Sequence, residues 1–582
     1  MRHFWLTSAL ATLFLLSGCE QTTQDVSLSA ASTNSAPAPQ PPPSNATVGK
    51  AAIASAHPLA TEAGLTILQQ GGNAFDAAIA VAASLGVVEP YSAGIGGGGF
   101  WLLYRAQDAS YHFIDARETA PQAFHRDYYL DAEGNVDRDK AVNGATAGGI
   151  PGQPAAFAHL AENYGKLPLT QTLSAAITQA REGFPVDPHY QKLMGFRLDA
   201  VQRYPESARI FLDDSRIPDE GFVLKQPELA ATLERLASEG FDGFYRGPLA
   251  NTMVTEVNAE GGSWTLDDLA GYTVKERAPI RVTVGNTEFI SAPPPSSGGI
   301  AIAQMLKMLE HFNWTDLNEA DQIHLLTEVM RRAYRDRAEY LGDPDFIDVP
   351  VAELISDERN TAWAKSIDMN KATPSLTLTG PKNIEEGFHT THLSIVDAEG
   401  NRVSATLSIN LPFGSAYTIP GTGILLNNEM DDFSAKPGEP NAYGLVGNEA
   451  NAIAPGKRPL SSMSPSMLES EDNIAILGTP GGSRIISMVF LGTLEYLQDK
   501  PVQDWVSRPR IHHQYLPDVI QHEPGVIAPD VMATLAERGH RFKDVGRQYG
   551  NMQAILIDKQ TGKISAAADP RGIGSANVMS QP

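Results

Sequence analysis

Thr390, a threonine in the middle of the chain, is the residue whose position most strongly indicates chemistry. It follows His389 and opens the alternating run at residues 390–396. A threonine hydroxyl inside a chain is a weak nucleophile, but the hydroxyl of a first residue has its own α-amine as a base. Cleavage of the chain between His389 and Thr390 would therefore create a threonine nucleophile.

Two short strands are expected to position this threonine. Residues 390–396 and 402–408 alternate between apolar and polar side chains, which is typical of half-buried strands, and turn-forming residues separate them. In a hairpin symmetric about Glu399, Ser408 lies opposite Thr390, with Cβ atoms about 4.5–5.5 Å apart. We expect the two hydroxyls to form a hydrogen bond. An ordinary hairpin with a threonine pair fits the same pattern.

Glycines precede two other predicted elements, a strand at residues 100–104 and a helix at residues 485–497. Helices are predicted at residues 61–70, 74–85, 301–312, 321–341 and 485–497. The last of them opens at Gly481-Gly482, where backbone N–H groups could stabilise the oxyanion that forms when an acyl carbon is attacked; a plain helix-start turn is the alternative. The glycine run at 96–99 lacks the Gly-Lys-Ser/Thr of a Walker motif, so we expect a close backbone approach there and no phosphate cradle.

The composition is that of a large soluble protein. Its 582 residues, 42% of them hydrophobic, can bury a substantial core. A net charge of −24 argues against nucleic-acid binding, which normally requires a basic surface. His512 and His513 are adjacent, so they point to different sides of a strand, and no group of residues has zinc-ligand spacing. The sequence therefore predicts no catalytic metal and no cofactor.

The N-terminus predicts export. Residues 1–18 join a basic start to an apolar run too short for a comfortable membrane span, and the residues around Cys19 resemble a bacterial lipobox. Cys19 is the only cysteine, which excludes intramolecular disulfides. Residues 19–47 form a Pro/Ser/Ala-rich segment typical of a disordered tether. We expect a body on the periplasmic side of the cell envelope, held by lipid on Cys19; a plain secretory signal is the alternative.

A set of motifs in one order resembles the γ-glutamyltranspeptidase family, from about residue 48 to residue 575. The motifs are HPLATEAG at 57–64, GGNAFDAA at 71–78, GIGGGGF at 94–100, RETAP at 117–121, PPPSSGG at 293–299, TTH at 390–392, GILLNNEMDDF at 423–433, RPLSSMSP at 458–465 and GGSR at 481–484. The resemblance implies an α/β fold, the four-layer αββα sandwich of N-terminal-nucleophile hydrolases. It also implies a precursor cut at His389/Thr390 into a large subunit, 48–389, and a small catalytic subunit, 390–582, which stay together as a heterodimer.

The same resemblance implies a role for each matching residue. Thr390 is the nucleophile, Thr391 helps to orient it, and Ser408 stands where many members have threonine. The resemblance assigns the oxyanion to Gly481 and Gly482. It assigns the substrate α-carboxylate to Arg117, Ser461 and Ser462, the α-ammonium to Asn410, Glu429 and Asp432, and a place in a lid over the glutamyl site, at 437–456, to Tyr443.

These roles describe a γ-glutamyl hydrolase/transferase. We expect it to cleave γ-glutamyl amides such as glutathione and to pass the glutamyl group to water or to an amino acid or peptide. Two alternatives stay open. One is an acylase for glutaryl-type (cephalosporin) amides, which lack the α-ammonium, and the other is a lipoprotein that binds amino acids without turnover.

Overall fold

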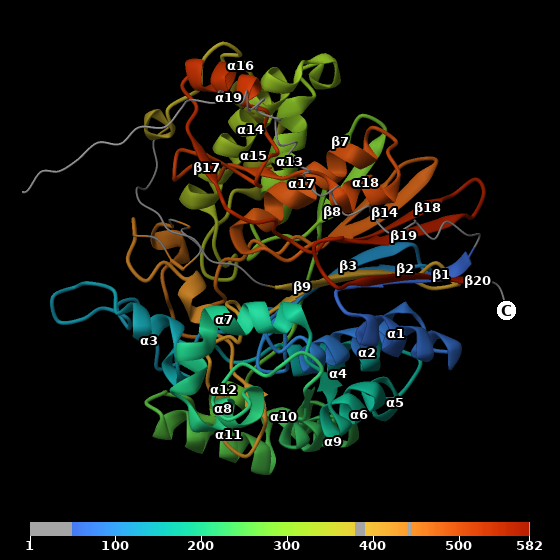
Figure 1. The fold of residues 1–582 in the computed structure, drawn as a ribbon, viewed down its shortest axis with the longest axis vertical. Coiled ribbons are helices and arrows are strands. Elements are labelled where there is room, and N and C mark those ends of the chain that lie inside the picture. Colours follow the sequence, from blue (N-terminus) through green and yellow to red (C-terminus); the bar gives the residue numbers. More distant parts are fainter. Residues whose placement is uncertain (1–48, 379–389, 440, 443–444, 446, 581–582) are drawn as a thin grey trace, which may run out of the picture. The chain divides into compact units, whose positions relative to one another are not determined.

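The computed structural model describes residues 49–378, 390–439, 441–442, 445 and 447–580. In this part of the chain, two antiparallel sheets lie face to face between two layers of helices (Figure 1). The sheets contact each other directly, since Ser394 Oγ donates to the Gln553 carbonyl and Ser404 Oγ donates to the Leu477 carbonyl, each across the two sheets. The expected four-layer αββα fold is confirmed.

The first sheet has seven strands, and neighbours in the sheet are often distant in the chain. In sheet order the strands are β20 (Ser575–Ser580), β1 (Gly49–Ser55), β9 (Thr391–Val396), β10 (Arg402–Ser408), β2 (Gly98–Arg105), β3 (Ser110–Ala116) and β6 (Lys275–Arg277). Strands β9 and β10, from residues 390–582, thus lie between β1 and β2 from residues 48–389, and β20, also from residues 390–582, is the edge strand beside β1. The two predicted subunits share one sheet.

The second sheet has six strands and mixes the same two parts of the chain. In sheet order they are β19 (Ile564–Ala568), β18 (Gln553–Asp558), β14 (Asn473–Gly478), β13 (Ser466–Glu469), β8 (Thr287–Ser291) and β7 (Ile280–Val284). Smaller sheets pair β4 (Phe184–Pro185) with β5 (Val223–Leu224), β11 (Thr418–Ile419) with β12 (Ile424–Leu425), and β15 (Ile511–His512) with β16 (Ile520–His522) and β17 (Phe542–Asp544).

The helices divide between the two outer layers, as Figure 1 shows. On the side of the first sheet are α1 (Pro58–Gln69), α2 (Ala74–Val88), α3 (Arg138–Val142), α4 (Gln153–Asn163), α5 (Leu169–Thr172), α6 (Ser174–Glu182), α7 (Pro188–Gln202), α8 (Pro205–Phe211), α9 (Pro227–Glu239), α10 (Phe241–Tyr245), α11 (Gly247–Ala259) and α12 (Leu266–Ala270). On the side of the second sheet are α13 (Gly298–Leu309), α14 (Glu319–Tyr340), α15 (Val351–Leu354), α16 (Asp357–Lys365), α17 (Ile485–Tyr496), α18 (Val502–Ser507) and α19 (Pro529–Glu537). The five predicted helices are confirmed as α1, α2, α13, α14 and α17.

Helix α2 positions the hairpin that carries Thr390. Its start is fixed by a capping box in which the Asn73 side chain accepts from the Asp76 N–H and the Asp76 side chain accepts from the Asn73 N–H. The Ala74 N–H donates to Asp397 in the hairpin loop, over 2.8 Å. The helix runs under β9 and β10 and ends at Glu89. Its alanines allow this close packing because they leave little side chain between helix and sheet.

The strands β9 and β10 are buried on both faces, so the prediction of half-buried strands is wrong. Leu393 and Ile395 pack in the core shared with α2, as expected of an apolar face. The polar face, however, lies against the second sheet, where the His392 ring is hydrogen-bonded to Thr406 Oγ1 over 2.8 Å. An alternating sequence shows that one face of a strand is polar. It does not show whether water or a second sheet supplies the hydrogen-bond partners of that face.

Candidate active site

Thr390 lies immediately before β9, at the point where the hairpin strands end. Thr391 pairs with Leu407, so the next step of the same register places Thr390 opposite Ser408, as the symmetric hairpin predicted. Both residues are buried. Ser408 Oγ accepts a hydrogen bond of 2.8 Å from the Asn410 N–H, which fixes the serine rotamer. The hydrogen bond between the two hydroxyls stays a prediction.

The glycine run at 96–99 packs directly against the strand that carries Ser408. Gly98 pairs with Ser408 in the sheet, and a Cβ atom on Gly97 would lie 2.1 Å from the Ser408 carbonyl oxygen. No side chain fits there, because real Cβ atoms do not approach backbone oxygens so closely. The expected close backbone approach is confirmed, and it holds β10 in place beside Thr390.

A second glycine pair lies on the opposite side of Thr390. Gly481 has φ +145° and Gly482 has φ +57°, and they lead through a short turn at Gly482–Arg484 into α17. Gly481 and Thr390 line one cavity, and Gly482 and Thr390 line a second. The turn therefore lies at the junction of the two cavities, where N–H groups of a helix start can reach an oxyanion. Their role as oxyanion donors stays a prediction.

One of these cavities, which we name the polar pocket, collects most of the predicted site. Residues far apart in the chain meet in it, from β10, α14, the turn at Glu429–Asp432 and the segment around Ser461. Its lining includes Thr390, Ser408, Asn410, Arg117, Glu429, Asp432, Ser461, Ser462 and Gly482, together with Arg337, Leu445, Met463, Ser483 and Ile485. Every predicted substrate-binding residue in the described part of the chain lines this pocket.

Three charged residues of the polar pocket, Arg117, Glu429 and Asp432, form one ion cluster. Arg117 is 1% exposed, and its guanidinium lies 2.6 Å from a Glu429 oxygen, 3.5 Å from a Glu118 oxygen, and in an ion pair with Asp432. The sequence assigned Arg117 to a ligand carboxylate and the two acids of the Glu429–Asp432 turn to a ligand ammonium. In this structure those groups bind one another. A ligand carrying both charges can replace the pairs with pairs of its own.

Burial of this cluster shifts its acid–base equilibria. Loss of hydration raises the pKa of Glu429 to about 7, against the opposing effect of Arg117. The pKa of Glu118 lies well above its usual range, chiefly because the carboxyl is buried and Glu429 is near. A cation that binds beside these two carboxyl groups therefore favours the loss of their protons.

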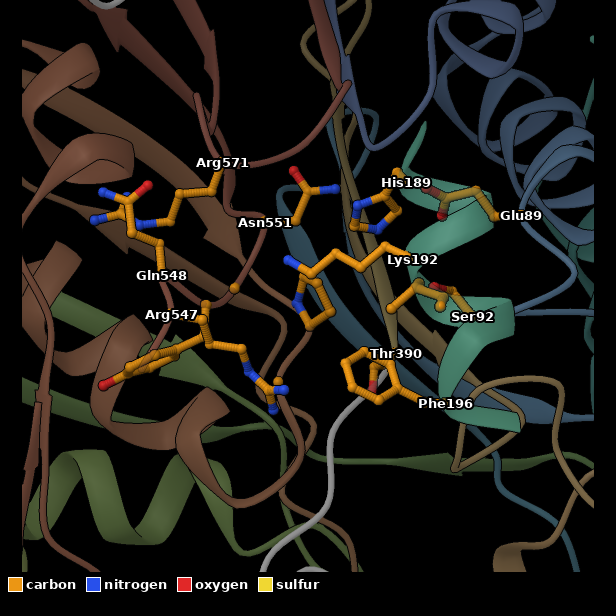
Figure 2. Close-up of a pocket in the computed structure, with 15 residues that line it drawn as sticks. Glu89, Ser92, His189, Lys192, Phe196, Thr390, Arg547, Gln548, Asn551 and Arg571 are labelled. Carbon is orange, nitrogen blue, oxygen red and sulfur yellow. The ribbon is translucent and has the colours of Figure 1, made fainter. Parts of the chain in front are cut away.

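The second cavity, which we name the outer cavity, opens on the other side of Thr390 (Figure 2). Figure 2 shows Lys192 of α7 and Arg547 extending into it from opposite walls. The Arg547 guanidinium lies over the Phe196 ring, 5.5 Å from its centre. A third cation, Arg571, is neutralised by Glu523 and Asp569. Lys192, which is exposed, thus brings positive charge to the solvent side of the cavity.

Sequence reasoning missed two buried residues of the site. Glu89 accepts a hydrogen bond from Thr391, and it lines the outer cavity with Thr390. Arg337, from the last turn of α14, lines the polar pocket. Neither lies beside a predicted site residue in the chain, and only tertiary packing brings them in.

Three predicted sites lie outside the described residues: Cys19, His389 and Tyr443. The described part of the chain holds no group of three or more His, Cys, Asp or Glu side chains that could bind a metal ion. Across residues 49–378, 390–439 and the described remainder, no helix has the length and apolar composition to cross a bilayer. The predicted absence of metal and cofactor stays a prediction.

Comparison with known proteins gives one consistent result. The family model for gamma-glutamyltranspeptidase matches residues 60–579. The glutathione hydrolase proenzyme of Pseudomonas aeruginosa is 41% identical over 547 residues, covering 92% of this chain and 95% of that protein. The corresponding protein of Escherichia coli is 40% identical over 533 residues and 90% of each chain.

Solved structures agree with this result. The crystal structure of cephalosporin acylase from Bacillus halodurans superposes with a TM-score of 0.83 at 29% identity, covering 94% of this chain and 99% of that one. Helicobacter pylori gamma-glutamyltranspeptidase superposes with a TM-score of 0.56 at 34% identity, covering 58% and 97%. With its residues 60–579 matched by the family model, the chain belongs to the gamma-glutamyltranspeptidase family of enzymes.

Proposed function

We propose that this protein is a self-processed γ-glutamyl hydrolase/transferase with Thr390 as its nucleophile. The observation that carries the proposal is that Thr390 and the glycine turn at Gly482 border a pocket that holds two arginines and two acids. A γ-glutamyl group has an α-carboxylate and an α-ammonium, and this pocket has a partner for each.

Maturation begins with the uncut chain. The Thr390 hydroxyl attacks the carbonyl carbon of His389, the peptide C–N bond breaks, and the acyl group moves from nitrogen to oxygen. Water then hydrolyses the ester and leaves Thr390 with a free α-amine. The large fragment, 48–389, and the small fragment, 390–582, remain as a heterodimer, which the strands shared between their sheets support.

Turnover uses the new amine as the base. Near neutral pH an α-amine with an ordinary pKa of about 7.7–8.0 can accept the hydroxyl proton. Thr390 Oγ then attacks the γ-carbonyl carbon, the Gly481 and Gly482 N–H groups stabilise the oxyanion, and the amine leaves with a proton. Water or a second amine attacks the glutamyl ester and restores Thr390.

The two cavities divide the substrate between them. The polar pocket receives the γ-glutamyl group, and the outer cavity receives the leaving amine or the acceptor. Glutathione fits this division because its leaving dipeptide ends in a carboxylate, for which Lys192 of the outer cavity offers positive charge. Amino acids and peptides offer the same groups as acceptors.

We further propose that the protein is a lipoprotein of the cell envelope. Its signal segment 1–18, Cys19 and the tether 19–47 support export, lipidation and anchoring on the periplasmic side of a membrane. Radiolabelled fatty acid incorporated into the wild-type protein, and not into a Cys19→Ala variant, would establish the anchor.

Intact-mass measurement with N-terminal sequencing tests the processing. A 193-residue fragment beginning at Thr390 (582 − 390 + 1) is expected from the wild type, and Thr390→Ala is expected to give one uncut, inactive chain. Cleavage at His389 in that variant would refute the role of Thr390.

A glutaryl-type acylase is the second candidate, because two proteins similar to this chain are named as acylases, one of them the cephalosporin acylase that shares the fold. The acylase ACY 1 proenzyme of a Pseudomonas strain is 36% identical over 543 residues, covering 91% of this chain and 93% of that one. Glutaryl compounds lack the α-ammonium that Glu429 and Asp432 would bind. Faster turnover of γ-glutamyl anilide than of glutaryl anilide supports the first candidate, and the reverse order supports the second.

A further inference from the structure

Arg337 is a buried arginine in the wall of the polar pocket. It projects from the last turn of α14, it is 5% exposed, and it lines the pocket together with Thr390, Ser461 and Ser462. Long cationic side chains are rarely buried unless an anion accompanies them. The anion that accompanies Arg337 therefore has to be identified.

Among the described residues, no carboxylate forms an ion pair with Arg337. Its guanidinium donates hydrogen bonds to two neutral hydroxyls, from Nε to Ser297 Oγ over 3.0 Å and from Nη2 to Ser462 Oγ over 3.4 Å. Burial without such a partner lowers the pKa of Arg337 to about 10. The guanidinium is still charged at neutral pH, and it is incompletely compensated.

Arg117 shows the opposite situation in the same pocket. Three carboxylates, those of Glu118, Glu429 and Asp432, lie within ion-pair distance of its guanidinium. A carboxylate that approaches Arg117 alone meets the negative charge of these acids. A carboxylate that approaches Arg337 meets a cation hydrogen-bonded to two hydroxyls, with Asp432 nearby but no described carboxylate within ion-pair distance.

The hydrogen bonds of the hydroxyls around Arg337 have defined donors and acceptors. Ser297 Oγ donates its only proton to the Ser461 carbonyl, over 2.7 Å, so it can only accept from Arg337. This chain of bonds fixes the backbone of Ser461. Because Arg337 also donates to Ser462 Oγ, the Ser462 hydroxyl keeps its proton for another acceptor.

We infer that Arg337 is a second cation for the α-carboxylate of the γ-glutamyl group, acting with the Ser462 hydroxyl that it orients. The inference rests on the proposed function and adds a residue that the family resemblance did not assign. Arg337 attracts the carboxylate and turns the Ser462 proton toward it, and Arg117 keeps the acids in place for the ammonium. Arg337 is a positioning residue in this scheme, and its effect depends on the ligand's carboxylate.

Substrates with and without that carboxylate test the inference. The pair is γ-L-glutamyl anilide and 4-aminobutyryl anilide, which differ only in the α-carboxylate. We expect Arg337→Gln to raise KM for the first by about 10- to 100-fold, the usual size of a lost charge-assisted hydrogen bond, with a smaller change in kcat. We expect kcat/KM for the second substrate to change less than threefold, a difference too small to represent the loss of such a bond.

Two further variants separate recognition from folding. Arg337→Lys keeps the charge and is expected to recover part of the affinity for γ-glutamyl anilide. Arg335→Gln changes a neighbouring arginine of α14 that does not line the pocket, and it controls for damage to the helix. Equal losses on both substrates, or a lower kcat with unchanged KM, would show that Arg337 is only structural.

The same experiment first tests the proposed function, through the N-terminus and the activity of the wild-type protein. If the wild-type protein lacks an N-terminal Thr390 or does not hydrolyse γ-glutamyl anilide, the proposed function fails whatever the Arg337 variants do. If the wild type is cut and active while Arg337→Gln keeps its KM for γ-glutamyl anilide, only the inference about Arg337 fails.

Discussion

Thr391 Oγ1 donates a hydrogen bond of 2.8 Å to Glu89 Oε2. The bond joins the first residue of β9 to the C-cap residue of α2, and it lies one residue from Thr390, the proposed nucleophile. Glu89 is 2% exposed, and the Tyr91 hydroxyl lies 3.4 Å from its other oxygen. A buried acid thus holds the residue that follows Thr390.

Glu89 is expected to make the protein less stable as pH rises. Burial raises its pKa from 4.5 in the reference state to about 7 in the folded protein, so between these values the folded state keeps a proton that the unfolded state has lost. The effect is absent below pH 4.5 and complete above pH 7, where it destabilises the fold by about 3 kcal/mol.

Glu89→Gln keeps an acceptor for Thr391 and removes this titration. We expect the variant to match the wild type near pH 4.5 and to be more stable at pH 8. Denaturant unfolding in the uncut Thr390→Ala background measures the free energy of unfolding of one chain at each pH. Parallel pH curves for the two proteins would contradict the shifted pKa.

Gly481→Ala is expected to reduce kcat by about 100-fold, the scale of a lost oxyanion donor. At φ +145° an alanine is strained, so the turn and its N–H groups must move, whereas the Met488 methyl group 2.4 Å from the new Cβ can turn aside. Gly562→Ala is the matched control, because Gly562 also has positive φ and no atom lies near its Cβ position. A Gly481→Ala enzyme with normal kcat would exclude this glycine from the oxyanion site.

Ser408→Ala is expected to slow both the cleavage at His389 and the turnover, by about 10- to 100-fold, because a misplaced reactive group loses orientation. The variant removes the hydroxyl opposite Thr390 and the acceptor of the Asn410 N–H. Ser408→Thr keeps the hydroxyl and is expected to stay close to the wild type. Ser404→Ala, on the same strand but hydrogen-bonded to β14, is the control. Rates are followed by intact mass and anilide release.

Lys192→Ala is expected to weaken acceptors that carry a carboxylate. With γ-glutamyl anilide as donor, KM for glycylglycine should rise by about three- to tenfold at low salt and by less at high salt, since an exposed charge is screened. KM for glycinamide, which has no carboxylate, should not change. Lys225→Ala, another exposed lysine but outside the outer cavity, is the control. Equal effects on both acceptors would place the acceptor carboxylate elsewhere.

Local pattern was enough to predict the hairpin and five of the helices, α1, α2, α13, α14 and α17. The register of Thr390 against Ser408 follows from two alternating runs around one short loop, which few chain geometries can satisfy. Helix α17, predicted at 485–497, spans Ile485–Tyr496 because its start at the glycine turn is encoded in adjacent residues. The family motifs then supplied residues that no local pattern links, such as Arg117 and Asp432.

Two properties of the site depend on contacts that no local pattern contains. Arg337 and Ser462 are 125 positions apart, and only the packing of α14 beside the second sheet brings them together. The cluster of Arg117 with Glu429 and Asp432 depends on which charges fill the pocket in the absence of a zwitterionic ligand. Residue types predicted these charges, but the sequence could not show that they neutralise one another.

Because both predicted subunits contribute strands to the same sheets, activity requires that these sheets have assembled correctly. Strand β9, which follows Thr390, pairs with β1 from the other side of the proposed cut, and β10 pairs with β2. In the maturation that we propose, the Thr390 hydroxyl is therefore positioned to attack the His389 carbonyl carbon only after the whole sandwich has assembled. A misassembled copy would neither cut itself nor hydrolyse a substrate. The single self-cleavage step thus restricts activity to correctly folded molecules.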